Sequence, residues 1–292
     1  KIERSVIILN MITKILKART IGDNKATMEE ASAVLRAGGL VAFPTETVYG
    51  LGGDATDPEA SKKIYAAKGR PSDNPLIVHI ADFSQLQNIS GDLPKEAKLL
   101  ADAFWPGPLT MVVNKNSVIP YETTGGLDTV AVRMPSHPVA LELIRESGVM
   151  IAAPSANTSG RPSPTKAEHV AEDLNGRIDM IIDGGPVDIG IESTIVDLTE
   201  DIPMILRPGF INKAMLEEVI GEVRVDPAIV ADNDTLSGAK PKAPGMRYKH
   251  YAPKGELTVV KGTQEEVVNK INQLSKEHEA CGKKTGIIAT SQ

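Results

Sequence analysis

The feature of this 292-residue chain that most limits its fold is a series of short segments in which almost every residue is apolar. Strands that are buried on both faces of a sheet read as continuous apolar runs, so we expect these segments to be such strands. The expected strands are 40–43, 76–80, 109–113, 129–132, 149–153, 180–182, 194–196 and 204–206. Helical segments separate several of them, and the sequence therefore predicts an α/β domain.

Helix starts are expected where side chains can satisfy the N–H groups of a first turn. Thr27 with Glu30, and Thr165 with Glu168, have the spacing of capping boxes. The expected helices are 28–37, 59–67 and 212–220.

The pattern of helices and strands lapses between about Val225 and Pro253, which is typical of a linker. After it we expect one β-α-β unit, with strands over 257–261 and 285–289 and a helix over 264–278. A unit of that size cannot bury its own faces. We therefore predict three parts: a main domain over 20–225, a linker or lid over 226–254, and an incomplete C-terminal α/β domain over 255–292.

Composition argues against several classes of protein. The net charge of −6 disfavours broad binding to nucleic-acid backbones. The single cysteine, Cys281, excludes an internal disulfide framework and a cysteine-rich metal site, which suits a cytoplasmic protein, and we predict no metal ligands. No apolar run approaches the ~20 residues of a membrane-spanning helix. The patterns of P-loop enzymes, zinc proteases and serine hydrolases are also missing from the sequence.

Polar side chains follow four of the expected strands at the point where each strand ends. In chain order they are Thr45 and Thr47, Arg133, Ser155 and Asn157, and Arg207. In open α/β sheets, ligands bind outside the carboxyl ends of the strands. The alternative is that such residues are simply common in turns. The repetition at four strand ends favours a binding site.

Arg133 directly follows an apolar strand, where a buried guanidinium without a partner would cost several kcal/mol. It must therefore meet an anion. Either a structural Asp or Glu provides that anion, or a ligand carboxylate does, which arginine can bind bidentately. Spacing alone does not decide between them.

Five more residues are candidates for the site, and for all but Ser193 a structural interpretation stands beside the functional one. Lys68 and Arg70 end a helix, where cations stabilise the helix dipole, or they lie in a rigid loop that binds phosphates. His79, within an apolar strand, is either a core residue or part of a site. Thr110 begins a strand and is either a cross-strand hydroxyl or a ligand contact. Ser193 follows a glycine-rich loop that could close over a site.

One glycine pattern resembles a dinucleotide-binding turn only weakly. Residues 50–55 match the Gly-x-Gly-x-x-Ala of dinucleotide-binding turns. Several residues, including Pro44, separate these glycines from the preceding strand, so the match is weak. A dinucleotide-dependent oxidoreductase is one alternative function.

The chain resembles the threonylcarbamoyl-AMP synthases, whose catalytic domain is called YrdC-like. The resembling motifs are 43–51, 68–79, 105–110, 132–135, 153–157 and 206–209. They fall within a likeness that spans about 27–224, and 244–253 resembles the linker of the longer, two-domain members.

This resemblance implies a twisted mixed α/β sheet, flanked by helices and enclosing a basic cavity, with 20–225 as the catalytic domain. It implies that ATP, L-threonine and bicarbonate form threonylcarbamoyl-AMP and pyrophosphate, with Mg²⁺ carried on the phosphates. The product would pass to the machinery that modifies adenosine 37 of tRNA, with direct tRNA binding weak or absent. Such a reaction depends on positioning and charge neutralisation, so no acid–base triad is required.

The resemblance also implies roles for individual residues. Lys68 and Arg70 would be catalytic. The ATP side of the pocket would be formed by Lys68, Arg70, Asn74, Thr110, Ser155, Asn157, Ser163, Arg207 and Tyr248. The threonine side would be formed by Thr47, His79, Arg133 and Ser193. Two alternatives within this fold are an RNA-binding module and a paralogue that adenylates another small acid.

Overall fold

The computed structural model describes residues 12–18, 24–230 and 256–289. Tyr248 and most of the expected linker lie outside these described residues. The chain divides into two compact units, 1–252 and 253–292, and each is treated by itself below. Among the described residues, no helix combines the length and the apolar composition that crossing a bilayer requires.

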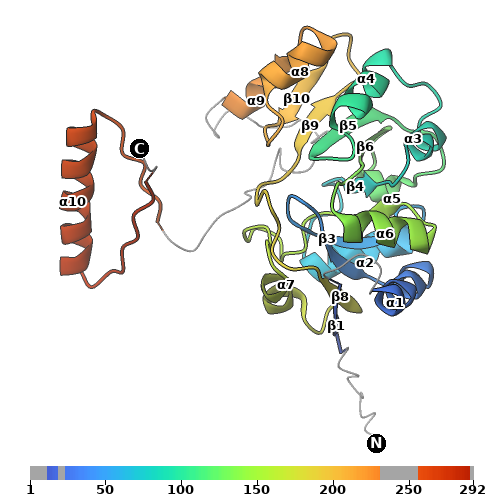
Figure 1. The fold of residues 1–292 in the computed structure, drawn as a ribbon, viewed down its shortest axis with the longest axis horizontal. Helices are drawn as coiled ribbons and strands as arrows, with labels where there is room; N and C mark the ends of the chain where they lie inside the picture. The colour runs from blue at the N-terminus through green and yellow to red at the C-terminus, as the bar shows by residue number, and fades with distance from the viewer. Residues whose placement is uncertain (1–11, 19–23, 231–255, 290–292) are drawn as a thin grey trace, which may run out of the picture. The chain divides into compact units, whose positions relative to one another are not determined.

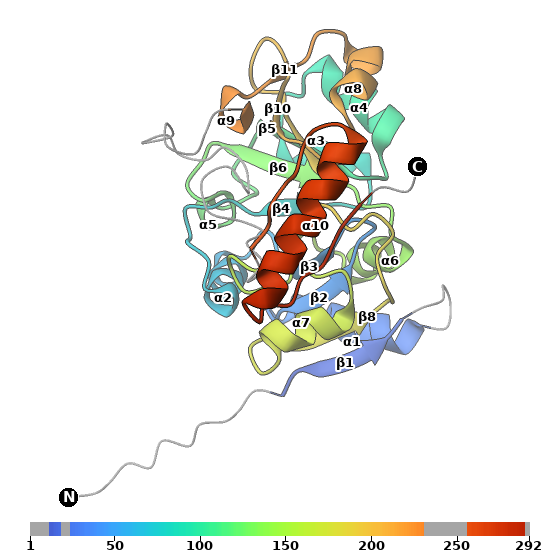
Figure 2. The same cartoon turned by 90° about the vertical axis from the view of Figure 1, so that its left-hand side faces the viewer.

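The first unit is built on a mixed sheet in which, among the described residues, eleven strands follow the order β1-β8-β2-β3-β7-β4-β6-β5-β9-β10-β11. The strands are β1 (Lys14–Lys17), β2 (Val41–Pro44), β3 (Tyr49–Asp54), β4 (Ile77–His79), β5 (Leu109–Asn114), β6 (Thr129–Arg133), β7 (Ile151–Ala152), β8 (Met180–Asp183), β9 (Thr194–Asp197), β10 (Met204–Arg207) and β11 (Arg224–Val225). In Figure 2, β1 lies at the bottom of this sheet and β11 at the top.

Helices cover both ends of this sheet. They are α1 (Lys25–Arg36), α2 (Pro58–Lys68), α3 (Phe83–Ile89), α4 (Lys95–Phe104), α5 (Tyr121–Thr124), α6 (Pro138–Ser147), α7 (Ala167–Leu174), α8 (Lys213–Ile220) and α9 (Pro227–Val230) in the first unit, and α10 (Gln264–Ala280) in the second. Helices α1 and α6 pack together near β2, and α4 packs against α8 near the other end (Figure 1). The sequence-based prediction of an α/β fold is confirmed.

Apolar side chains form cores on both faces of the sheet, as the continuous strands predicted. In β2, Ala42 belongs to one buried cluster while its neighbours Val41 and Phe43 belong to another, because successive side chains point to opposite faces. A third, smaller cluster contains Ile77 of β4. Ala153 belongs to the same cluster as Phe43. Ile77 and Ala153, from different clusters, both line the pocket described below.

All the expected strands of the first unit are present, but β1, β3 and β11 were not predicted. The Gly-x-Gly-x-x-Ala pattern lies within β3 rather than in a turn, so it is not a dinucleotide-binding turn. Its glycines allow close packing instead. A Cβ atom on Gly52 would lie 2.6 Å from Cγ2 of Ile151 in the neighbouring strand β7.

Neither expected capping box is formed. Helix α1 begins two residues before Thr27, with Asn24 at its N-cap and no side-chain cap. Helix α7 begins two residues after Thr165, and its N-cap is Lys166. The threonines therefore do not occupy the N-cap position from which a hydroxyl reaches the N3 amide. Capping boxes do occur at Asp82 in α3 and at Thr263 in α10.

In the second unit the expected helix is confirmed, but the expected strands are not formed. Residues 257–261 and 285–289 adopt no strand structure, and α10 buries none of its side chains. Leu257 and Val259 are 74% and 72% exposed. A strand requires a neighbour that pairs with its backbone groups, and a single helix cannot supply one.

Candidate active site

The ends of five strands meet at one place in the sheet. Parallel strands β4 and β6 end side by side, with His79 opposite Arg133. Strand β5 runs antiparallel to β6 and so begins here, with Thr110 also opposite Arg133. Strand β9 begins beside β5, and β10 ends with Arg207 opposite Ile195 of β9. The topology thus gathers residues from distant parts of the chain.

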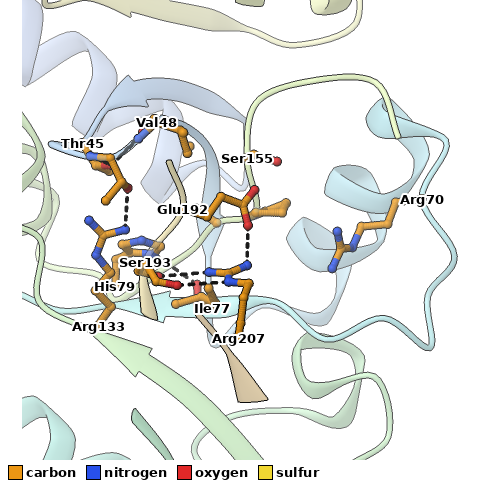
Figure 3. A pocket seen from close by; sticks show the side chains of 14 residues that line it. Thr45, Val48, Arg70, Ile77, His79, Arg133, Ser155, Glu192, Ser193 and Arg207 are labelled. Carbon is orange, nitrogen blue, oxygen red and sulfur yellow. Dashed lines mark hydrogen bonds and ion pairs between the residues drawn. The ribbon is translucent and has the colours of Figure 1, made fainter. Parts of the chain in front are cut away.

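A solvent-open pocket of about 510 Å³ lies at these strand ends (Figure 3). Its wall contains Thr45, Thr47, Val48, Gly50, Arg70, Ile77, His79, Arg133, Ala153, Pro154, Ser155, Glu192, Ser193 and Arg207. The predicted site residues Thr47, Arg70, His79, Arg133, Ser155, Ser193 and Arg207 are therefore brought together.

The other predicted site residues do not line this pocket. Lys68, Asn74, Thr110 and Ser163 each contact a residue that does. Asn157 contacts Lys68. Tyr248 lies outside the described residues.

Arg133 is buried, and a protein carboxylate does meet it. Its Nη2 atom lies 2.7 Å from Oε1 of Glu46, which is also buried. Nη1 donates to the Thr47 hydroxyl at 2.9 Å, and Nε donates to the Gly107 carbonyl at 3.3 Å. Burial lowers the pKa of Arg133, and the Glu46 carboxylate opposes that shift. The guanidinium is thus held by a structural anion while it also forms part of the pocket wall.

The turn after β2 supplies two of the partners of Arg133, Glu46 and Thr47. The Thr45 hydroxyl accepts hydrogen bonds from the amides of Thr47 and Val48, each at 3.2 Å, and donates to the Val48 carbonyl at 2.7 Å. This bonding fixes the turn between β2 and β3. Sequence reasoning gave Glu46 no role. Two features of the sequence point to Glu46: Arg133 requires an anion, and Glu46 lies between two threonines at the end of another strand.

Lys68, the last residue of α2, points into the protein. Its Nζ donates to the carbonyls of Ser155 and Asn157, both at 2.5 Å. Helix α2 ends there because Gly69 adopts a left-handed conformation, with φ of 61°. Burial, and then the nearby Arg70 guanidinium, lowers the pKa of Lys68 to about 7. Through its two hydrogen bonds, the side-chain nitrogen of Lys68 holds the turn that follows β7.

Arg70 reaches the pocket from the loop after α2. Its Nε donates to the Asn74 carbonyl at 3.2 Å, and Nη2 donates to the Pro75 carbonyl at 3.0 Å. Figure 3 shows its side chain set apart from those of Arg133 and Arg207, on the other side of Ser155. The cations are therefore spread around the pocket wall.

Arg207 is held by the segment that precedes β9. Its Nε donates to the Ser193 carbonyl at 3.0 Å, Nη2 donates to the Ser193 hydroxyl at 3.1 Å, and Nη1 forms an ion pair with Glu192. The Ser193 hydroxyl also contacts that of Thr110 at 2.7 Å. Glu192 has no role in the sequence-based prediction, although it lies directly before Ser193.

His79 lies between the pocket and the core. Its Nδ1 is 3.1 Å from the Ile77 carbonyl, and its ring meets that of Phe43 edge-on, with centroids 6.1 Å apart. Burial, and next the Arg133 guanidinium, lowers the pKa of His79 to about 3. The imidazole is therefore neutral near pH 7, so it adds no charge to the pocket.

This arrangement suits the binding of anions rather than acid–base catalysis by a triad. Guanidinium groups lie on different sides of an open pocket, and hydroxyls lie between them. Arginines bind carboxylates and phosphates through several N–H groups at once. Among the described residues, no group of three or more His, Cys, Asp or Glu side chains could hold a metal ion.

Comparison with known proteins is consistent across sequence and structure. Residues 33–209 match the Sua5–YciO–YrdC family, described as Telomere recombination. Residues 211–292 match the family described as Threonylcarbamoyl-AMP synthase, C-terminal domain.

Several curated relatives carry the name threonylcarbamoyl-AMP synthase, among them proteins from Pyrococcus abyssi and Bacillus subtilis. The one from Pyrococcus abyssi is 55% identical over 89% of this chain and 75% of its own length. The one from Bacillus subtilis is 52% identical over 93% of this chain and 76% of its own length. A crystal structure of P. abyssi Sua5 complexed with L-threonine superposes with a TM-score of 0.88 at 51% identity, covering 97% of this chain and 81% of that one.

Proposed function

Because the chain belongs to the two-domain threonylcarbamoyl-AMP synthase family, we propose that it converts ATP, L-threonine and bicarbonate into threonylcarbamoyl-AMP and pyrophosphate. The observation that supports this proposal is the set of guanidinium groups around one open pocket at the strand ends. An amino acid and a nucleotide are both anionic at the groups that arginine recognises.

On the threonine side, Arg133 binds the substrate carboxylate, with Thr47, His79 and Ser193 around the amino acid. All four line the pocket. The structure of the P. abyssi relative with L-threonine supports this choice of amino acid.

On the ATP side, Arg70, Ser155 and Arg207 line the pocket and bind the nucleotide. Asn74, Thr110, Asn157 and Ser163 support that wall from outside the lining. Lys68 was predicted to be catalytic by contact with ATP. The side-chain nitrogen of Lys68 donates to the carbonyls of Ser155 and Asn157 instead, so we propose that Lys68 positions the turn that follows β7.

The chemistry follows from positioning. The threonine amine and bicarbonate form a carbamate with loss of water, and a carbamate oxygen attacks the α-phosphorus of ATP, so that pyrophosphate leaves. The attacking group is already an anion, and the surrounding cations offset the charge that develops on the phosphates. Mg²⁺ would be carried by the phosphates and would neutralise part of their charge. We infer that the product serves the modification of adenosine 37 in tRNA.

The decisive experiment measures pyrophosphate release from ATP with bicarbonate, with each amino acid in turn, and identifies the adenylate by mass. We expect release with L-threonine. The variants Arg70→Ala and Lys68→Ala should lose at least about tenfold in rate, whereas Arg224→Ala, which removes a surface arginine, should not. Full activity in Arg70→Ala would contradict the assigned phosphate contact. Release with a different amino acid would indicate a paralogue with another substrate.

A further inference from the structure

The ATP side of the pocket already contains an anion that belongs to the protein. Oε1 of Glu192 accepts a hydrogen bond from the Ser163 hydroxyl at 2.8 Å, and Oε2 is in ion-pair contact with Nη1 of Arg207. Ser163 follows β7 and Arg207 ends β10, so segments far apart in the chain converge on one carboxylate. Arg207 is a proposed contact of ATP, and Ser163 supports the same wall from behind Glu192.

This carboxylate occupies the kind of environment that a phosphate requires. A hydroxyl and a guanidinium are typical donors to phosphate oxygens. Among the described residues, Glu192 provides the one carboxylate of the pocket wall, and its side chain is 16% exposed. Figure 3 shows it between Arg207 and Ser155.

Glu192 also offsets the positive charge of the pocket beyond Arg207. Its negative charge raises the pKa of Lys68 and of Arg133, against the lowering that burial causes. A polyphosphate that enters the pocket therefore meets cations whose charge one carboxylate already partly neutralises. The carboxylate and a phosphate cannot share Arg207 closely without repulsion between like charges.

Backbone hydrogen bonds fix the chain just before Glu192. The backbone amides of Ile189 and Gly190 donate to the carbonyls of Glu46 and Thr47, at 2.9 and 3.0 Å. Gly190 has a positive φ of 75°, and Ile191 is 53% exposed. The turn that holds Arg133 is bonded to Ile189 and Gly190 rather than to the Glu192 side chain, so movement of that side chain need not disturb the turn.

We propose that Glu192 occupies a phosphate position of the nucleotide site and is exchanged for a phosphate group of ATP when the nucleotide binds. The inference rests on the proposed function, because it takes Arg207 as a contact of ATP and Ser163 as a second donor that the departing carboxylate leaves open to a phosphate. In the free protein Glu192 satisfies both donors, and in the loaded protein a phosphate replaces it.

The test measures the binding of inorganic pyrophosphate and of ATP by calorimetry, with and without Mg²⁺. The variants are Glu192→Gln, Glu192→Ala and the control Glu217→Gln, which removes the same charge from the surface of α8. We expect both Glu192 variants to bind metal-free pyrophosphate at least about tenfold more tightly than the unmodified protein, and Glu217→Gln to bind it equally. Glutamine keeps an oxygen that can accept from Ser163, so this variant should fold, and thermal unfolding checks that.

Unchanged or weaker pyrophosphate binding in both Glu192 variants would overturn the exchange. Weaker binding of ATP only when Mg²⁺ is present would also overturn it, because Glu192 would then assist the metal rather than compete with phosphate. The variant Arg207→Gln separates this failure from that of the proposed function. If Arg207→Gln leaves ATP binding unchanged, the assigned ATP side is wrong. If it weakens ATP binding while the Glu192 variants change nothing, only the exchange is wrong.

Discussion

At the residue scale, Arg133 has a structural role and a proposed functional role at once. Its contact with Glu46 compensates a buried charge, and its place in the pocket wall makes it available to a ligand. The two alternatives that the sequence left open are therefore not exclusive. Removing one member of a buried ion pair is costly because the other charge remains buried, whereas replacing both by apolar groups is often neutral.

We predict that Arg133→Leu lowers the free energy of unfolding by about 3–5 kcal/mol. The double variant Glu46→Leu with Arg133→Leu should recover most of that loss, because no unpaired charge is left. Neither protein should bind L-threonine. Urea unfolding and calorimetry measure the two effects. If the double variant recovers both stability and threonine binding, Arg133 has only a structural role.

His79 gives a prediction about pH. Its pKa is about 3 in the folded protein, against an ordinary value of 6.5 in the unfolded chain. Below pH 6.5 the unfolded chain therefore binds a proton that the folded protein does not, and stability falls progressively down to about pH 3. Between pH 7.5 and 4.5, His79→Gln should lose less unfolding free energy than the unmodified protein. Urea unfolding at both pH values, with the exposed-site variant His169→Gln as control, tests this; parallel losses would argue against a neutral buried imidazole.

The sequence predicted half of the residues that line the pocket, but it predicted no role for Glu192 in the wall or for Glu46, which contacts Arg133. Arg133 and Arg207 could be found because a cation at the end of an apolar strand is unusual and because the family motifs include them. Glu46 and Glu192 belong to loops whose placement depends on how β2, β6 and β10 pair. No local pattern contains that information, since Glu46 lies far from Arg133 in the chain and strand β9 separates Glu192 from Arg207.

At the element scale, the strands of the first unit were predicted more reliably than the capping boxes. Continuous apolar segments indicate buried strands directly. Strand β3 was not predicted because it is rich in glycine. Glycine is unfavourable in strands unless a neighbouring group approaches closely. The two capping boxes were wrongly predicted because threonine and glutamate at the right spacing also occur inside a helix or before one. The actual N-cap depends on where the chain leaves the preceding loop.

Helix α8 provides a test of a real cap against an apparent one. The Asn212 side chain accepts a hydrogen bond from the Met215 amide at 3.0 Å. Asn212→Ala should therefore lower the free energy of unfolding by about 1 kcal/mol. Thr27→Ala, within α1, should change it by much less, because Thr27 caps no helix. Urea unfolding of both variants measures the difference, and equal losses would show that the cap is not the cause.

At the scale of the whole molecule, the two units differ in how they are stabilised. The first has buried clusters on both faces of its sheet, whereas α10 of the second buries no side chain. We predict that a fragment of residues 1–252 keeps a cooperative thermal unfolding transition and that a fragment of residues 253–292 shows none. Circular dichroism during heating tests both. A cooperative transition in the shorter fragment would mean that it has a core of its own.

The glycines of β3 have a consequence for how such a pocket can acquire new specificities. Gly50 lines the pocket, and a methyl group there would meet the Ala153 side chain at 3.3 Å; at Gly52 it would collide with Ile151. At Gly50 the wall is peptide backbone, and a side chain there would press against Ala153. Substitutions that reshape the cavity should therefore be tolerated better elsewhere in the lining, such as in the segment of Glu192, whose neighbour Ile191 is exposed, and new substrate preferences should arise there.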